Sequence, residues 1–428
     1  MTVQLITLGC SRNLVDSEHL LHHFKNRGHR VLHNEYHPPA DIVIINTCGF
    51  IRDAKEESVD TILQYLEEKK KGNLKRLFVM GCLSERYREE LKEELPGVDE
   101  FFGVRELPKI LQAAGILQDP VLYAGRMVTP PGHYAYLKIS EGCNRSCSFC
   151  AIPGIRGKHQ SVPMERLVSE ASYLAGEGAR ELILIAQDLT SYGLDLYRKH
   201  ALPDLLKKLV RLKDVEWIRL HYAYPTGFPG EVIDLMASEE KICRYMDIPI
   251  QHINDHILSA MGRGYDRKQM EALLNRFRSQ IPGVALRTTV MVGFPEETEE
   301  AFKELMDFLE AFRFDRLGVF PYSHEEDTPA HFRYPDRIPE KVKSERAGEV
   351  MKLQQEISLQ LNREKIGKTL GVLIDRTESS QTIGRTEYDS PEVDNEVIIQ
   401  SDRELATGSF QQVIITGAEA FDLYGKVI

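Results

Sequence analysis

The sequence lacks the features that would place it in a membrane or an oxidising compartment. It has no run of eighteen apolar residues, so we expect no membrane-spanning helix. Its first residues lack a positively charged segment and a small-residue cleavage site, which predicts no secretory signal and a cytoplasmic protein. Seven cysteines, an odd number in a chain of 428 residues, argue against a disulfide framework.

The sequence also has fewer basic than acidic residues. The chain has 54 Lys and Arg against 65 Asp and Glu, a formal net charge of −11. General attraction to nucleic-acid phosphates is therefore not expected to dominate, although a local basic patch could still bind them. A basic protein partner suits this charge better.

The length predicts two or three domains, and the first is an α/β domain with a parallel sheet. Continuous apolar strands at 3–8, 41–46 and 76–80 alternate with amphipathic helices at 13–28 and 52–71 and a charged helix to about residue 95. Such alternation is typical of a parallel sheet covered by helices. Prolines and glycines between 118 and 133 then mark a linker.

A second α/β run follows the linker. Its strand candidates lie at 135–140, 181–186, 216–221, 245–250, 286–292 and 316–321. Six such units favour a partial (β/α)6 barrel, although periodicity alone does not separate a barrel from a doubly wound sheet.

The last part of the chain changes character twice. Residues 338–365 form a long charged helix, with Pro339 suited to its first turn. Short β-rich pieces at 371–375, 396–399 and 412–415 then predict a small antiparallel β-barrel. The expected organisation is 1–120, a linker at 121–133, a central domain at 134–335, a helical connection at 336–365 and the barrel at 366–428.

Three cysteines stand close together after the first strand of the central domain. Cys143, Cys147 and Cys150 have the spacing CxxxCxxC. Three thiolates on one loop can hold three irons of a 4Fe–4S cube and leave the fourth iron open to a substrate. Zinc is the alternative, but it usually takes four protein ligands, and no fourth cysteine is nearby.

This pattern, with the aromatic Phe149 before the last cysteine, resembles the radical S-adenosylmethionine superfamily. The resemblance implies that the open iron chelates the methionine part of S-adenosylmethionine. It also implies that an electron from the cluster releases a 5′-deoxyadenosyl radical, while the protein orients the cofactor and excludes water.

Three further cysteines each follow a predicted strand of the first domain. Cys10, Cys48 and Cys82 lie just past the carboxyl ends of strands 3–8, 41–46 and 76–80. Parallel strands share that edge, so these cysteines should converge and hold a second 4Fe–4S cluster. The alternative is three buried core cysteines.

Two such triads, followed by a small barrel, resemble the methylthiotransferase family of radical S-adenosylmethionine enzymes, whose C-terminal barrel is a TRAM domain. The resemblance implies two 4Fe–4S clusters, S-adenosylmethionine, and an external electron donor and sulfur source. It also implies that the N-terminal cluster supplies or holds the inserted sulfur. One cofactor molecule would methylate that sulfur and a second would generate the radical.

Cofactor contacts are expected at the carboxyl ends of the central strands. By resemblance we place Gln187, Gln251, Gly293 and Phe149 near S-adenosylmethionine. Lys138 or Arg287 could meet a carboxylate, or could be paired structurally. His221 and His252 could act as acid or base, or could be hydrogen-bonded structural residues; no catalytic residue is assigned. Cys243 is expected in the core.

Two features favour a protein as the substrate. The phrases around Cys10, Gln251, Met261 and Tyr322 resemble the branch of the family that modifies an aspartate β-carbon of ribosomal protein twelve of the small subunit. Residues 366–428 carry five Lys or Arg and eleven Asp or Glu, a charge of −6 that should attract a basic protein.

Several alternatives to this prediction stay open. The enzyme could modify an adenosine of transfer RNA, or its second cluster could only relay electrons. The acidic residues of the barrel could serve solubility alone. A non-catalytic TRAM-type nucleic-acid-binding protein is a further class, but the CxxxCxxC loop argues against it.

Overall fold

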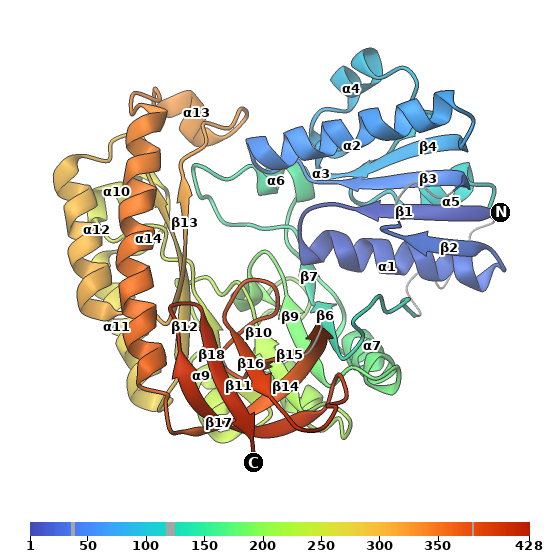
Figure 1. The fold of residues 1–428 in the computed structure, drawn as a ribbon. Helices are drawn as coiled ribbons and strands as arrows, with labels where there is room; N and C mark the ends of the chain where they lie inside the picture. The colour runs from blue at the N-terminus through green and yellow to red at the C-terminus, as the bar shows by residue number, and fades with distance from the viewer. Residues whose placement is uncertain (36–38, 117–124, 379–380) are drawn as a thin grey trace. The chain divides into compact units, whose positions relative to one another are not determined.

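The computed structural model describes residues 1–35, 39–116, 125–378 and 381–428 in two compact units (Figure 1). The first unit contains Met1–Pro130, Tyr136–Asn144 and Ala151–Gln160. The second contains Pro131–Ala135, Arg145–Cys150 and Ser161–Ile428. Part of the predicted linker, at 121–124, and the predicted domain end at 120 lie outside the described residues. Within the described residues, every helix is too short or too polar to cross a membrane.

A five-stranded parallel sheet forms the centre of the first unit, in the order β2-β1-β3-β4-β5. The predicted strands are confirmed as β1 (Thr2–Thr7), β3 (Ala40–Thr47) and β4 (Leu74–Gly81). Two short edge strands, β2 (Arg30–His33) and β5 (Glu100–Phe101), were not predicted, because such short segments show no periodicity. The order has a reversal between β1 and β3, where ligands bind in doubly wound sheets.

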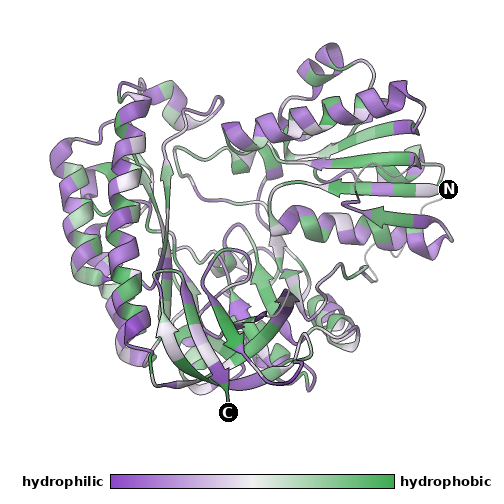
Figure 2. Ribbon diagram, viewed as in Figure 1, coloured by the Kyte–Doolittle hydropathy of each residue, from purple (hydrophilic) through white to green (hydrophobic). Residues whose placement is uncertain are grey.

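Helices cover both faces of this sheet, which is why its central strands carry buried apolar side chains toward both faces (Figure 2). They are α1 (Ser11–Asn26), α2 (Arg52–Lys70), α3 (Cys82–Arg86), α4 (Arg88–Glu94) and α5 (Leu107–Ala113). The single charged helix predicted up to residue 95 is wrong. It is two helices, because Tyr87 leaves the helical conformation at φ −127° and ψ 33°.

The second unit contains a sheet whose strands follow one another in chain order. They are β6 (Tyr134–Lys138), β9 (Glu181–Ile185), β10 (Trp217–Leu220), β11 (Ile242–Asp247), β12 (Ala285–Val292) and β13 (Arg316–Pro321). Strand β6 begins in this unit and its last residues belong to the first. A consecutive parallel order has no reversal, so it is a partial (β/α)6 barrel and not a doubly wound sheet.

Helices alternate with these strands, as the sequence predicts (Figure 1). They are α7 (Met164–Gly176), α8 (Leu202–Leu209), α9 (Gly230–Ser238), α10 (Asp255–Ala260), α11 (Arg267–Gln280) and α12 (Glu299–Phe312). The long helix α14 (Glu340–Arg363) packs along β13, and Pro339 is its N-cap rather than part of its first turn. The short elements are β7 (Ser140–Glu141), α6 (Ile152–Arg156), β8 (Gln160–Ser161), the 3-10 helix η1 (Leu189–Ser191) and α13 (Pro329–Arg333).

The C-terminal strands close into a barrel in the order β14-β15-β16-β18-β17. They are β14 (Thr369–Glu378), β15 (Gln381–Thr386), β16 (Glu396–Gln400), β17 (Phe410–Ala418) and β18 (Asp422–Val427). The prediction of a wholly antiparallel barrel is wrong at one place, because β16 and β18 are parallel. A closed ring with an odd number of strands cannot alternate direction at every pairing, so one parallel pair is required.

Buried ion pairs join this barrel to the sheet of the same unit. Glu181 on β9 pairs with Arg219 on β10 at 2.6 Å and with Arg385 on β15 at 2.9 Å. Arg385 also pairs with Asp375 on β14 at 2.7 Å. The Glu181 and Arg219 side chains are completely buried. Each charge is compensated, so the network stabilises the interface only while every member is present.

Glu181→Gln should therefore destabilise the protein strongly. The substitution leaves two buried guanidinium groups short of a negative charge, which costs about 3–5 kcal/mol. Denaturant titration followed by circular dichroism measures the change. Glu240→Gln, at an exposed position, is the matched control and should change the free energy of unfolding by less than about 0.5 kcal/mol.

Candidate functional site

The three spread cysteines lie at the carboxyl edge of the first sheet. Cys10 follows β1 and is the N-cap of α1, Cys48 follows β3, and Cys82 follows β4 as the first residue of α3. All seven cysteines of the chain lie among the described residues, and none forms a disulfide. The positions are those expected from the sequence.

Glycines beside these cysteines allow their loops to touch. A Cβ on Gly9 would lie 2.8 Å from the Cβ and 3.0 Å from the sulfur of Cys48. A Cβ on Gly49 would lie 2.6 Å from backbone atoms of Leu83 and 2.8 Å from the carbonyl carbon of Cys82. No larger residue fits at either position without moving backbone. The structure thus brings the three cysteines together.

A buried arginine that was not predicted from the sequence stands beside this triad. The guanidinium of Arg156, on α6, lies 3.4 Å from the sulfur of Cys82 and donates to the Asn13 side chain at 2.6 Å. It also pairs with Glu141 at 3.0 Å. No spacing connects Arg156 to Cys82 in the sequence, so only the contacts of the folded chain reveal it.

The charges around Arg156 are balanced. Lys138 pairs with Asp16 and, at 2.8 Å, with Glu141. Arg156 pairs with Glu141 and, at 3.4 Å, with Asp16. Two cations and two carboxylates form one cluster, so the positive charge of the guanidinium beside Cys82 is partly offset. Lys138 is thereby engaged in this cluster, which favours the structural alternative for it.

The three thiols differ in acidity. Burial acts to raise the pKa of Cys10, but Arg12, Arg156 and backbone N–H groups together hold it below its usual value. Burial raises the pKa of Cys48, and it raises that of Cys82 to about 11 against the opposing effect of Arg156. The cause in each case is the balance of lost hydration against nearby positive charge.

The CxxxCxxC loop crosses the division between the units, and its parts are described separately. In the first unit, the N–H of Cys143 donates to the carbonyl of Gly157 at 3.0 Å. In the second unit, the N–H of Ser148 donates to the carbonyl of Met261 at 2.8 Å, and Ser148 accepts from the N–H of Ala330 at 2.7 Å. Backbone bonds on both sides therefore fix the loop.

Arg263 and Tyr224 both lie beside the sulfur of Cys147, and Arg145 packs on the Tyr224 ring. Arg145 pairs with Asp188 at 2.8 Å, and its guanidinium lies 4.0 Å from the centre of the Tyr224 ring. The guanidinium of Arg263 lies 4.5 Å from the centre of the same ring. It also donates to the sulfur of Cys147 at 3.2 Å. Met261, Gly262 and Arg263 belong to a sequence segment that resembles the family. The contact of Arg263 with a cysteine is not predicted by that resemblance.

The arrangement of the thiols bears on the kind of metal group they fit. A single Zn²⁺ needs its ligands about 2.0–2.3 Å from one point. Within the parts of the chain that the structure describes, no three His, Cys, Asp or Glu side chains converge in this way. Cys10, Cys48 and Cys82 match in number the three thiolates that a 4Fe–4S cube takes when its fourth iron stays open.

The residues predicted to contact S-adenosylmethionine lie at strand ends of the second unit. Gln187 follows β9 and Gln251 follows β11, and both are half-buried. Phe149 packs against a cluster that contains Met261 and Phe294. The space over Gly293 is occupied, because a Cβ there would overlap the side chain of Lys343 on α14. These assignments stay predictions.

Backbone strain marks the same edge. Tyr222, Gln251 and Glu296 have φ of 64°, 63° and 80°, and they follow β10, β11 and β12. Each such conformation costs a non-glycine residue about 1–3 kcal/mol and persists where surrounding structure imposes it. Side-chain types do not signal this strain, so Tyr222 and Glu296 were missed.

The two candidate histidines are engaged in structural hydrogen bonds. His221 shares a hydrogen bond with Ser390 at 2.8 Å. His252 accepts from the N–H of Asn254 at 3.0 Å and lies 3.5 Å from the Glu297 carboxylate. The structure therefore favours the alternative of structural residues over that of acid or base.

Arg287 and Cys243 also have structural surroundings. Arg287 pairs at 3.3 Å with Asp247 and with Asp394 of the barrel. Cys243 is buried against Tyr245 and Ala285, as expected of a core cysteine. Arg287 is therefore held in ion pairs and Cys243 is packed in the core, both within the second unit.

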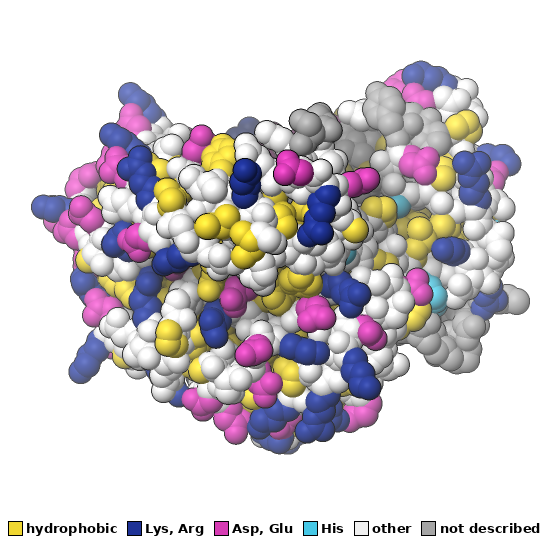
Figure 3. Space-filling model, turned by 60° about the horizontal axis from the view of Figure 1, so that its bottom comes forward, with side chains coloured by type: hydrophobic (Ala, Val, Ile, Leu, Met, Phe, Trp, Pro, Cys, Tyr) yellow, Lys and Arg dark blue, Asp and Glu magenta, His cyan; other side chains and the backbone are white. Residues whose placement is uncertain are grey.

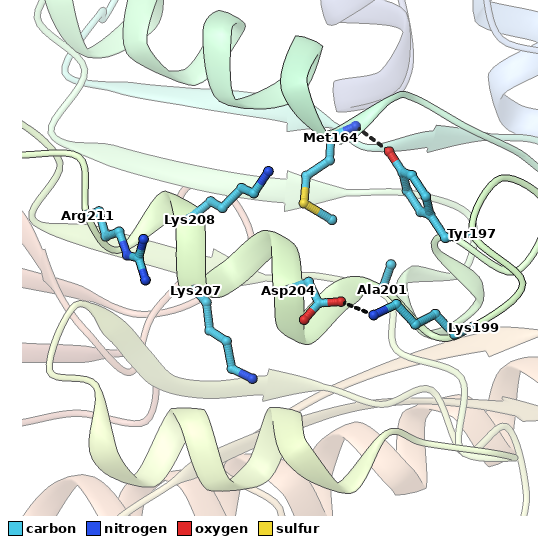
Figure 4. Close-up of a pocket in the computed structure, with 8 residues that line it drawn as sticks. All are labelled: Met164, Tyr197, Lys199, Ala201, Asp204, Lys207, Lys208 and Arg211. Atoms are coloured by element: carbon cyan, nitrogen blue, oxygen red, sulfur yellow. Dashed lines mark hydrogen bonds and ion pairs between the residues drawn. The ribbon is translucent and has the colours of Figure 1, made fainter.

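A surface pocket of about 410 Å³ lies beside α8 (Figure 4). Its lining includes Lys199, Asp204, Lys207, Lys208 and Arg211. Lys199 pairs with Asp204 at 2.6 Å, and Lys208 lies 3.5 Å from Glu165. No residue of either cysteine triad and no predicted cofactor contact lines this pocket, so we assign it no role in the chemistry.

Comparison with known families agrees with this architecture. Residues 2–103 match the uncharacterized protein family UPF0004, residues 137–309 match the radical SAM superfamily, and residues 366–428 match the TRAM domain. The fold and the cysteine loop thus define a radical S-adenosylmethionine protein. Membership of that superfamily implies a 4Fe–4S cluster and S-adenosylmethionine.

Curated relatives narrow the class to one family. The chain is 53% identical over 425 residues to the ribosomal protein uS12 methylthiotransferase RimO of Flavobacterium psychrophilum, covering 99% of this chain and 97% of the relative. It is 51% identical over 427 residues to RimO of Bacteroides thetaiotaomicron, covering 100% and 98%. The chain belongs to the RimO family of methylthiotransferases.

Solved structures support the fold alone. The radical S-adenosylmethionine methyltransferase TsrM from Kitasatospora setae, solved with cobalamin and a [4Fe-4S] cluster bound, matches with a TM-score of 0.57 at 15% identity, covering 95% of this chain and 83% of that one. The cobalamin-dependent S-adenosylmethionine radical enzyme OxsB matches with a TM-score of 0.53 at 14% identity, covering 83% and 56%.

The acidity of the thiols predicts an order of reactivity in metal-free protein. Because the thiolate is the nucleophile, iodoacetamide at neutral pH should alkylate Cys10 faster than Cys82. Arg156→Met should slow Cys10, since it removes a positive charge that favours its thiolate. Mass spectrometry of quenched samples gives the rates, and the fully buried Cys243 is the slow internal reference. Equal rates at Cys10 and Cys82 would contradict the described electrostatics.

Proposed function

We propose that this protein transfers a methylthio group to ribosomal protein uS12, at the β-carbon of an aspartate. The observation that carries the proposal is the full-length identity of 50–53% to curated uS12 methylthiotransferases. The two cysteine triads support it, because sulfur insertion at an unactivated carbon calls for both a radical and a held sulfur. A cytoplasmic location agrees with a ribosomal substrate.

The proposal assigns one 4Fe–4S cluster to each triad. Cys143, Cys147 and Cys150 would hold the cluster that binds S-adenosylmethionine, and Cys10, Cys48 and Cys82 would hold the second. Each set supplies three thiolates and leaves one iron open. Together, cluster and cofactor supply a primary alkyl radical able to remove hydrogen from a carbon that lacks a leaving group.

The remaining assignments follow from the same resemblance. Gln187, Gln251, Gly293 and Phe149 would position S-adenosylmethionine, with amide groups hydrogen-bonding its polar atoms. The functional regions would be 1–120, 134–335 and 366–428, which correspond to the three family matches. An external electron donor and a sulfur source complete the set of partners.

The surface of the barrel is less acidic than the net charge of its sequence indicates. Of its eleven carboxylates, those of Asp375, Asp389 and Asp394 are largely buried and paired with arginines. Exposed carboxylates remain at Glu378, Glu392, Asp402, Glu404 and Glu419. On the face drawn in Figure 3, acidic and basic side chains are interspersed. The family relationship therefore supports a protein substrate more strongly than the charge does.

Iron content tests the two-cluster proposal. Anaerobically reconstituted protein should bind about eight irons per chain, as two cubes. Replacing either triad by alanine should leave about four, whereas Cys243→Ala should leave about eight. A wild-type protein with a single cube, or with zinc, would rule the proposal out.

Mass spectrometry of uS12 tests the substrate. Deleting the gene for the present protein should remove one methylthio group from uS12, and the wild-type gene should restore it. A gene in which the codons for Cys143, Cys147 and Cys150 are changed to alanine should not restore it. The transfer RNA alternative predicts loss of a methylthio group from adenosine instead. It also predicts RNA binding that weakens steeply with salt.

A further inference from the structure

Arg263 occupies an unusual position beside the radical triad. Its side chain is buried, and its three terminal nitrogens are all engaged. Nε donates to the Tyr265 hydroxyl at 3.0 Å and Nη2 to the carbonyl of Pro249 at 2.6 Å. Nη1 donates to the sulfur of Cys147 at 3.2 Å. The guanidinium is therefore held rigidly in one orientation.

In the described part of the chain, the charge of Arg263 has no carboxylate partner. Among the described residues, no Asp or Glu lies within 4.0 Å of the Arg263 guanidinium. Other buried arginines of the chain do have such partners, including Arg219 with Glu181 and Arg316 with Asp389. An uncompensated buried cation is costly, so it requires an anion nearby. The sulfur of Cys147, 3.2 Å from Nη1, is where a bound cluster would supply negative charge.

The segment that carries Arg263 is shaped around the cysteine loop. Gly262 has φ of 68°, and a Cβ there would lie 2.6 Å from the carbonyl oxygen of Ser146. The carbonyl of Met261 accepts from the N–H of Ser148 at 2.8 Å. Three consecutive residues thus contact the loop, and only the last presents a charge to a sulfur.

We propose that Arg263 is the fixed counter-charge of the cluster held by Cys143, Cys147 and Cys150, and that it favours the one-electron-reduced form of that cluster. The inference rests on the proposed function, which places a cluster there. Reduction adds one negative charge beside a buried cation, where low dielectric strengthens the attraction. An N–H···S bond to a ligand sulfur acts in the same direction.

The other triad differs in this respect. Arg156 touches the sulfur of Cys82, but Asp16 and Glu141 neutralise it together with Lys138. Arg156 thus has carboxylate partners, whereas Arg263 has none among the described residues. Arg12 adds a further positive charge beside Cys10, so these charges do not rank the two clusters by ease of reduction. Arg263 is a positioning and electrostatic residue, since it acts through Cys147.

The test is a redox titration of the full-length protein with Cys10, Cys48 and Cys82 replaced by alanine, so that one cluster remains. The reduced cluster is followed by electron paramagnetic resonance without S-adenosylmethionine. Arg263→Met should lower the equilibrium constant for one-electron reduction by about tenfold or more, equal to about 59 mV for each factor of ten. Arg263→Lys keeps the charge and should shift it less.

Arg267→Gln is the matched control. It removes one positive charge four residues further along, at a side chain that is 40% exposed and paired with Glu271 and Glu304. It should leave the potential unchanged. An unshifted potential in an Arg263→Met protein that retains about four irons would overturn the inference but leave the proposed function intact. Absence of iron from the wild type would overturn both.

A second readout uses the wild-type protein, with Arg263→Lys as its control, in case Arg263→Met does not retain iron. Protein labelled with ¹⁵N-arginine should show a ¹⁵N coupling in the pulsed spectrum of the reduced cluster, because a guanidinium nitrogen lies 3.2 Å from a ligand sulfur. Loss of the coupling in Arg263→Lys supports the assignment. Absence of the coupling in the wild type contradicts it.

Discussion

Neighbouring parallel strands end at one edge of their sheet, and the position of the N-terminal cysteine triad depends on this constraint. Cys10, Cys48 and Cys82 are far apart in the chain but follow adjacent strands in the order β1, β3, β4. The constraint brings the loops near one another, and the small size of Gly9 and Gly49 lets them touch. A sheet with mixed strand directions would place these cysteines at opposite ends.

Buried arginines connect the parts of the second unit, and this changes what a count of charges means. Arg219, Arg287 and Arg316 of the β/α sheet each contact the C-terminal barrel, through its backbone carbonyls or its aspartates. The aspartates of these pairs belong to the interface, so they contribute little to the surface. Net charge computed over a segment of sequence therefore overestimates the field that a partner protein meets.

The sequence predicts the long elements well, because apolar runs and helical periodicity are local signals. Five strands of the partial barrel and the three main strands of the N-terminal sheet lie within two residues of the predicted bounds, whereas the strand predicted at 245–250 is β11 at Ile242–Asp247. Short edge strands, the break at Tyr87 and the parallel pair β16–β18 depend on tertiary contacts or on closure of the ring. The same reason explains why Arg156 and Arg263 were missed. Each contacts a cysteine more than seventy residues away in the chain, and no local spacing marks the contact.

In the proposed function, the two 4Fe–4S clusters have the same metal composition and the same three thiolate ligands. Any difference in their chemistry must therefore come from the side chains around them. At the N-terminal triad the guanidinium of Arg156 is paired with carboxylates and Arg12 adds a further positive charge, whereas at Cys147 a buried guanidinium has no carboxylate partner among the described residues. A charge held without compensation is tolerated in a folded protein only where something else repays its lost hydration. In the proposed function, the cluster bound at the sulfur of Cys147 would do this. The fold stability of the Arg263 segment and the electron affinity of the bound cluster are then two consequences of one contact.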